Sequence, residues 1–254
     1  MRLADTPALA RAGGQANASV PAGQSRSSAP CFDAALAAFA LGRDAVASAR
    51  DDLELEDWPA PRKLAPFAFA LAATAYRDGE EAGTGKLVLL YDPDGQDGWT
   101  GSFRIVCHVH ADVEEEMAAD PLLGEVGWSW LTDALDLHAP GYAAPSGTVT
   151  RVITEGFGGK SDEPPATAFE LRASWCPGDG SGSDGTVGGV GGDCGGDGGD
   201  FADELSGAVV AWCDLLAAAA GLPASGTVAI GGRAGQLRAT GSGSGSGSGG
   251  RRRR

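Results

Sequence analysis

The chain has 254 residues, of which 43% are hydrophobic, and its formal net charge is −15 at pH 7. This length allows one good core or two small ones, and the acidic balance argues against nucleic-acid binding because such a surface repels phosphate backbones. No apolar run is long enough to cross a membrane, and residues 1–15 lack the apolar stretch of a signal sequence, so we expect a cytoplasmic protein without a membrane partner.

The first half of the chain predicts one helix followed by three strands. Phe32, Leu36 and Phe39 recur at helical spacing in residues 31–49. Three segments follow in which apolar residues alternate with others or stand in a row, and turn sequences lie between these segments. These segments predict a three-stranded meander: FAFALAATAYR, GKLVLLYDP and SFRIVCHVHADV.

The second half predicts a helix, a hairpin and a last helix. Asp120 suits an N-cap and Pro121 suits the first position of a helix that contains the stretch GEVGWSWLTDALDLH. The segments GTVTRVITEGF and TAFELRASW predict two strands, and residues 201–223 predict a helix that stops at Gly221. We therefore expect an α+β fold with a five-stranded antiparallel sheet, packed helices and the order α-β-β-β-α-β-β-α.

Three segments carry too few large apolar side chains to form a core. Residues 1–30 are rich in Ala, Gly, Ser and Gln, residues 177–200 are rich in Gly and Asp, and residues 223–254 end in GSGSGSGSGGRRRR. We expect all three to be disordered or flexible. The remaining sequence predicts a single α+β domain at 31–222, which the Gly/Asp-rich insertion interrupts.

The five cysteines are an odd number, and no pair has the CxxC spacing. Cys107, Cys176 and Cys213 lie inside apolar segments. Reduced, buried thiols are typical of a cytoplasmic protein, so we expect free thiols rather than a disulfide framework.

The helix that follows Pro121 has two apolar sides. Trp130 lies on one line down this helix, whereas Trp128, Leu131 and Leu135 lie on another line about 130° away at 100° per residue. A helix that covers a sheet needs an apolar stripe of only about 100°. The second side is therefore either sunk between the sheet and another helix, or a contact surface for a second copy or for another partner.

Five stretches of the chain follow one another in a fixed order. They cover the predicted meander, the helix with the two tryptophans, the second hairpin and the last helix: LAPFAFALAATAYRDGEEAGTGKLVLLYDPDGQDGWTGSFRIV, MAADPLLGEVGWSWLTDAL, GTVTRVITEGFG, ELRASW and WCDLLAAAAGLP. In these stretches the chain resembles the actinobacterial domain-of-unknown-function family 3000, over residues 55–223. The resemblance implies no activity, ligand or catalytic residue.

The predicted order of elements is similar to that of the type III secretion chaperone-like fold, which the YbjN-like proteins share. Members of that group often dimerise and bind other proteins, and the helix between the two hairpins often contributes to the dimer contact. This resemblance implies that Trp128, Leu131 and Leu135 form an interaction face for a second copy of the chain. A shared fold does not by itself fix a function.

Two loop sequences approach ligand-binding motifs but miss a required residue. The stretch ITEGFGGKS has Thr154 where a phosphate loop needs its first glycine. The stretch DPDGQDG has Phe103 where a calcium loop needs its acidic twelfth ligand. We interpret the first as a loop that binds no phosphate and the second as a hairpin turn.

His108 and His110 share one face of a predicted strand. Two imidazoles on one face can hold a metal ion if a third ligand joins them, and Asp112 is the nearest candidate. The other interpretation is a solvated strand face with no ligand.

The sequence therefore assigns no catalytic residue and no cofactor. We interpret the chain as a non-catalytic protein-binding or chaperone-like module that acts as a homodimer in the cytoplasm and binds a further, unidentified protein. The alternative is a small enzyme or metal-binding protein that uses the strand face of His108 and His110.

Overall fold

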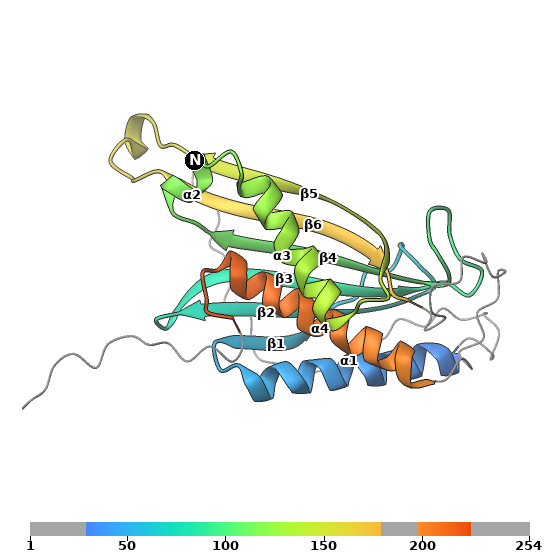
Figure 1. The fold of residues 1–254 in the computed structure, drawn as a ribbon. Coiled ribbons are helices and arrows are strands. Elements are labelled where there is room, and N and C mark those ends of the chain that lie inside the picture. The colour runs from blue at the N-terminus through green and yellow to red at the C-terminus, as the bar shows by residue number, and fades with distance from the viewer. Residues whose placement is uncertain (1–28, 179–197, 225–254) are drawn as a thin grey trace, which may run out of the picture.

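The computed structural model describes residues 29–178 and 198–224, which fold around one antiparallel sheet with helices on one of its faces (Figure 1). The six strands lie in the order β1-β2-β3-β4-β6-β5. They are β1 (Leu53–Trp58), β2 (Phe67–Arg77), β3 (Glu80–Tyr91), β4 (Phe103–Asp112), β5 (Ala143–Thr154) and β6 (Ala166–Cys176). The helices are α1 (Ala29–Ala49), α2 (Glu115–Ala119), α3 (Leu123–His138) and α4 (Gly198–Ala219), with a short 3-10 turn η1 (Gly158–Lys160).

The predicted five-stranded sheet with the order α-β-β-β-α-β-β-α is wrong, because β1 adds a sixth strand at the edge beside β2. In the register, Leu53 pairs with Ala75 and Trp58 pairs with Ala70. The sequence LELEDW alternates apolar and polar residues, as a strand does. Asp and Glu are depleted in strands, however, so their presence argues against a strand at the level of sequence. The strand tolerates them because Glu54 and Glu56 are exposed at the sheet edge.

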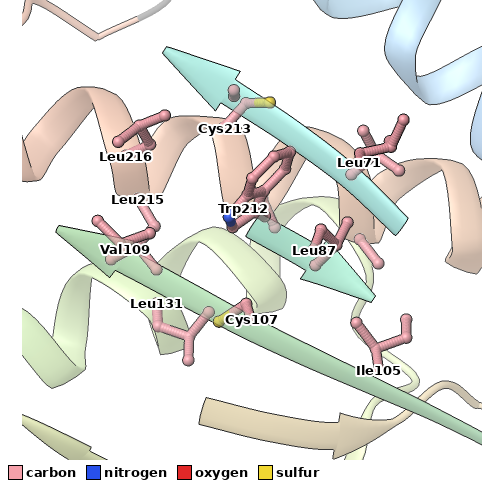
Figure 2. Packing of buried hydrophobic residues seen from close by; sticks show 14 of the residues in the cluster. Leu71, Leu87, Ile105, Cys107, Val109, Leu131, Trp212, Cys213, Leu215 and Leu216 are labelled. Atoms are coloured by element: carbon pink, nitrogen blue, oxygen red, sulfur yellow. The ribbon is translucent and has the colours of Figure 1, made fainter. Parts of the chain in front are cut away.

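The two faces of the sheet differ sharply along the central strands. In β4, Ile105, Cys107 and Val109 are fully buried beneath the helices, whereas Val106 and His108 on the opposite face are only half-buried. Side chains from three strands and two helices meet on the covered face (Figure 2). Those labelled there are Leu71, Leu87, Ile105, Cys107, Val109, Leu131, Trp212, Cys213, Leu215 and Leu216.

Helix α4 lies between α1 and α3 on the covered face and supplies the centre of the core (Figure 1). Trp212 on α4 is fully buried and lies directly over Gly85 of β3, where a Cβ atom would stand 2.8 Å from the indole Cζ2. Gly127 of α3 likewise leaves room for the ring of Phe169 on β6. These glycines let the helices approach the strands closely enough to bury large aromatic rings.

One predicted helix boundary differs from that observed, and another agrees with it. Helix α3 begins at Leu123 and has no side-chain cap, so the prediction of Asp120 as N-cap and Pro121 as first residue is wrong. The Asp120 carboxylate instead accepts a hydrogen bond of 2.8 Å from the Leu122 N–H, which closes a turn before the helix. The stop at Gly221 is confirmed, because Gly221, two residues after the last residue of α4, has a φ of +69°.

The predicted flexible segments fall largely outside the described residues. Helix α1 begins at Ala29, within the segment predicted as the N-terminal tail, and α4 begins at Gly198, within the predicted insertion. Predictions for residues 1–28, 179–197 and 225–254 lie outside the part of the chain that the structure describes.

Three of the cysteines follow the prediction. Cys107, Cys176 and Cys213 are free and buried. Cys31, at the start of α1, is disulfide-bonded, so the expectation of free thiols throughout is wrong at this position.

A membrane-spanning helix is not found among residues 29–178 and 198–224.

Replacing Gly85 with alanine is expected to lower the free energy of unfolding by about 1–3 kcal/mol, because the new methyl group overpacks the contact with the Trp212 indole. The matched control is Gly124→Ala in α3, where a Cβ atom has no neighbour within 4 Å. That change should leave stability unchanged or raise it by up to about 1 kcal/mol through helix propensity. Urea denaturation compares the two variants, and equal effects would contradict the proposed packing constraint.

Candidate functional site

The face of the sheet opposite α1, α3 and α4 carries most of the polar side chains that the central strands hold. We call it the open face. Strand pairing brings His108 opposite Lys86 and Arg172, and His110 opposite Glu170. On β3, β4 and β6 the open face consists of Thr84, Lys86, Val88, Leu90, Arg104, Val106, His108, His110, Asp112, Ala168, Glu170, Arg172, Ser174 and Cys176.

Glu170 is the centre of a charge network on this face. Its carboxylate lies 3.7 Å from His110 Nδ1, 4.0 Å from His108 Nε2 and 3.3 Å from Arg172 Nη2. The arginine is a permanent cation and supplies the charge that balances Glu170. The network therefore needs no bound ion to compensate the carboxylate.

Burial lowers the pKa of His108, with Glu170 acting in the opposite direction and Arg172, His110 and Lys86 adding to the decrease. Its Nε2 atom is buried and makes no hydrogen bond among the described residues, since the Glu170 oxygen at 4.0 Å is too distant. His108 is thus held as a neutral imidazole at pH 7.

The predicted metal ligands are not brought together as a ligand set. Within the described ranges, no group of three or more His, Cys, Asp or Glu side chains has an arrangement that could hold a metal ion. Asp112 is exposed at the end of β4, where it pairs with Ala168. His108 and His110 instead flank Glu170, which sequence reasoning did not single out as their shared neighbour.

Two of the three residues of the predicted interaction face on α3 lie inside the molecule. Leu131 and Leu135 are fully buried in the core and offer no surface to a second copy. Trp128 is half-buried and packs on β5 at Gly147, where a Cβ atom would stand 2.7 Å from the indole Cζ3. Helix α3 packs on both α4 and the sheet, and of its large apolar side chains Val126 and Leu137 stay exposed. Of the interpretations that the sequence left open, the structure matches the sunken helix.

Strand β5 forms a long, exposed edge of the sheet. It has 12 residues, all of them at least partly exposed, and it pairs with β6 on one side. Its sequence AAPSGTVTRVIT contains no carboxylate. The single charged side chain, Arg151, donates hydrogen bonds to the carbonyls of Ala118 at 3.4 Å and Asp120 at 2.8 Å. The edge therefore has one charge and lacks the row of like charges that usually discourages strand pairing.

The opposite edge of the sheet is protected in the usual way. Strand β1 has six residues and carries Glu54, Glu56 and Asp57. Short length and like charges both discourage pairing with another strand. The contrast singles out β5 as the edge that can accept a partner.

Exposed apolar side chains gather around the end of β5. Ile153 in the strand is 61% exposed and Phe157 just after it is 79% exposed. Met117 of α2 and Leu122 are exposed as well. Both lie in the segment that Arg151 of β5 holds through its hydrogen bonds to the carbonyls of Ala118 and Asp120. We call Met117, Leu122, Ile153 and Phe157 the apolar flank. An apolar flank beside an open strand edge is typical of a protein contact surface.

Two variants with opposite charge changes test the network around His108. Glu170→Gln should lower the pKa of His108 further, and Arg172→Gln should raise it. The pKa is measured from the imidazole carbon-bound proton shifts in an NMR titration. A shift of the same sign in both variants would contradict the arrangement.

The lowered pKa of His108 also sets the sign of a stability effect. The unfolded chain binds a proton at His108 near pH 6.5, whereas the folded chain binds it only at lower pH, so this residue makes stability fall as the pH falls below about 6.5. His108→Gln should reduce that part of the pH dependence in urea denaturation. A steeper dependence in the variant would be inconsistent with a His108 imidazole that stays neutral in the folded chain.

Comparisons with known proteins bear on the family alone. Neither the curated proteins nor the solved structures gave a match to this chain. The model of a family described as a protein of unknown function, DUF3000, matches residues 30–229. The matched range includes every strand of the sheet and nearly the whole of α1 to α4. The chain therefore belongs to the DUF3000 family of proteins of unknown function.

Proposed function

We propose that the chain is a non-catalytic protein-binding module that acts as a homodimer, with β5 as the strand that meets its copy. The observation that carries the proposal is the 12-residue edge strand without a carboxylate in a chain of net charge −15. Two acidic molecules can approach closely only where their facing surfaces lack like charges.

Antiparallel pairing of β5 with itself is the contact that suits this edge. A two-fold axis places the same strand from each copy side by side, so that both satisfy their outward backbone N–H and C=O groups. The two sheets then join into one continuous sheet. The apolar flank lies beside the same strand and adds hydrophobic burial to the backbone hydrogen bonds.

Trp128 takes part in this proposal only indirectly. Its indole packs on β5 at Gly147 from the helix side and fixes the position of the strand. Leu131 and Leu135 hold α3 in the core and have no contact role. The interface thus moves from the helix face, where the sequence predicted it, to the neighbouring strand.

The proposed chaperone-like role is the binding of other proteins at the same strand edge. The unpaired edge of a dissociated copy would accept an extended segment of another chain by strand addition, the mode in which backbone hydrogen bonds supply much of the affinity. In the homodimer this edge would be paired with the second copy and therefore protected from other chains. The partner in this role is an extended, uncharged or basic segment, because the surface of the domain is acidic.

The oligomeric state of the full chain tests the proposal. Light scattering after gel filtration, over a range of concentrations, should give twice the 25.5 kDa of one chain. Ile153→Glu should raise the dimer dissociation constant by at least about tenfold, because the symmetry brings an added carboxylate from each copy to one contact.

The matched control is Leu137→Glu, which alters a side chain that is 74% exposed near the C-terminal end of α3. This variant should remain dimeric. A wild-type chain that stays monomeric at all concentrations would refute the homodimer. Equal dissociation in both variants would move the interface away from β5.

The proposed cytoplasmic location has evidence on both sides. The free, buried thiols of Cys107, Cys176 and Cys213 support it, and the disulfide at Cys31 opposes it, because structural disulfides are rare in reducing compartments. Alkylation of cell extracts before reduction, followed by mass spectrometry of the peptide with Cys31, tests the compartment. A cytoplasmic protein should give the alkylated peptide without prior reduction, and its absence would argue for an oxidising compartment.

A further inference from the structure

Arg104 of β4 is a buried cation on the open face. Its side chain is 9% exposed, and its guanidinium donates to neutral groups around it. Nη1 donates to Cys176 Sγ at 3.3 Å, and Nη2 donates to Ser146 Oγ at 3.2 Å and to Ser174 Oγ at 2.8 Å. The Ser174 carbonyl accepts a longer bond of 3.4 Å from Nη2. These bonds fix the guanidinium in one orientation.

No carboxylate of the described residues lies within ion-pair distance of Arg104. Arg43, Arg50 and Arg172 each have one, at 3.3, 2.8 and 3.3 Å. Burying a cation without an anion is costly, because neutral hydrogen-bond partners replace only part of its hydration. The Nε–H also donates to none of the residues that the structure describes. Arg104 therefore has both an unbalanced charge and a donor left over.

A shallow depression of ≈ 430 Å³ lies beside this guanidinium. Its apolar part comes from Leu64, Leu90, Trp99 and Val106, and Ser174 and Arg104 supply polar groups. The loop that carries Trp99 is fastened at two points. Gln96 Nε2 donates to the Leu64 carbonyl at 3.0 Å, and the Thr100 N–H donates to Cys176 Sγ at 3.1 Å.

We propose that this depression binds a small organic acid with one carboxylate and an apolar or aromatic body. The carboxylate would pair with Arg104 and take the Nε–H, since guanidinium and carboxylate match as charge-assisted hydrogen-bond partners. The body would lie against Leu90, Val106 and Trp99. A small number of fixed polar groups on a mostly apolar wall is the composition of small-molecule sites.

The charge around the depression favours a monocarboxylate over anions with a higher charge. Asp97 stands at the rim, and the chain is acidic as a whole. A single buried arginine compensates one negative charge, so a phosphate dianion would leave a charge unbalanced beside Asp97. A monocarboxylate fits one cation and an apolar wall. The depression is lined by residues of β3, β4, β6 and the neighbouring loops, and among the described residues β5 reaches it only through Ser146, which accepts a hydrogen bond from Arg104.

Phenylacetate is a suitable probe, with phenylacetamide and inorganic phosphate as comparison ligands. Titration into isotopically labelled protein should shift the indole N–H signal of Trp99, assigned with Trp99→Phe, and give a dissociation constant of about 1 mM or lower. Phenylacetamide should bind at least about tenfold more weakly, because it lacks the charge. Tighter binding of phosphate than of phenylacetate would refute the ligand class, and no binding of phenylacetate at about 10 mM would refute the site.

Arg104→Gln should weaken phenylacetate binding by about tenfold or more, and unchanged binding in the folded variant would overturn the assignment. Because Arg104 is buried, a second variant guards against misfolding. Leu64→Asp adds a carboxylate at the rim, where the side chain is 51% exposed, and should also weaken binding. Leu137→Asp is its control on a distant exposed leucine and should bind as the wild type does. Equal affinity in the two aspartate variants would refute the location.

Discussion

The contact between Trp212 and Gly85 sets the architecture of this domain. The indole is fully buried between α4 and the sheet, and only a residue without a side chain allows β3 to approach it. With α4 fixed at that distance, α1 and α3 pack on its two sides and close the core. Burial of large aromatic rings contributes much of the stability of a core of this size, so the whole helical layer depends on this approach.

The helical layer decides which surfaces are left for function. It buries Leu131 and Leu135 of α3 and leaves the molecule with an open face and a strand edge that has no carboxylate. The open face separates into a charge network around Glu170 and a depression beside Arg104. The strand edge and the depression are distinct in chemistry: one offers backbone groups and exposed apolar side chains, and the other offers a fixed cation. The proposed partners of these two surfaces therefore differ in chemistry, and Ser146 links the surfaces because it lies in β5 and accepts a hydrogen bond from Arg104.

Periodicity was sufficient to predict most elements, and its failures have physical causes. The strand β1 escaped prediction because Glu54 and Glu56 oppose strand propensity, and an edge position compensates for them only once the sheet exists. The sequence pattern shows that α3 has two apolar sides. It does not show whether a second copy or α4 covers Leu131 and Leu135. Arg104 looks in the sequence like any polar residue of an alternating strand. Its isolation from carboxylates depends on the pairing of β4 with β6, which composition does not reveal.

The unequal edges of the sheet also limit how far assembly can proceed. If two copies join through β5, the outer edges of the combined sheet are both β1, with the acidic residues Glu54, Glu56 and Asp57. Those edges repel further strands, so the association closes at two and does not continue into a fibre. Carboxylates on one edge and their absence from the other thus allow pairing while preventing open-ended growth.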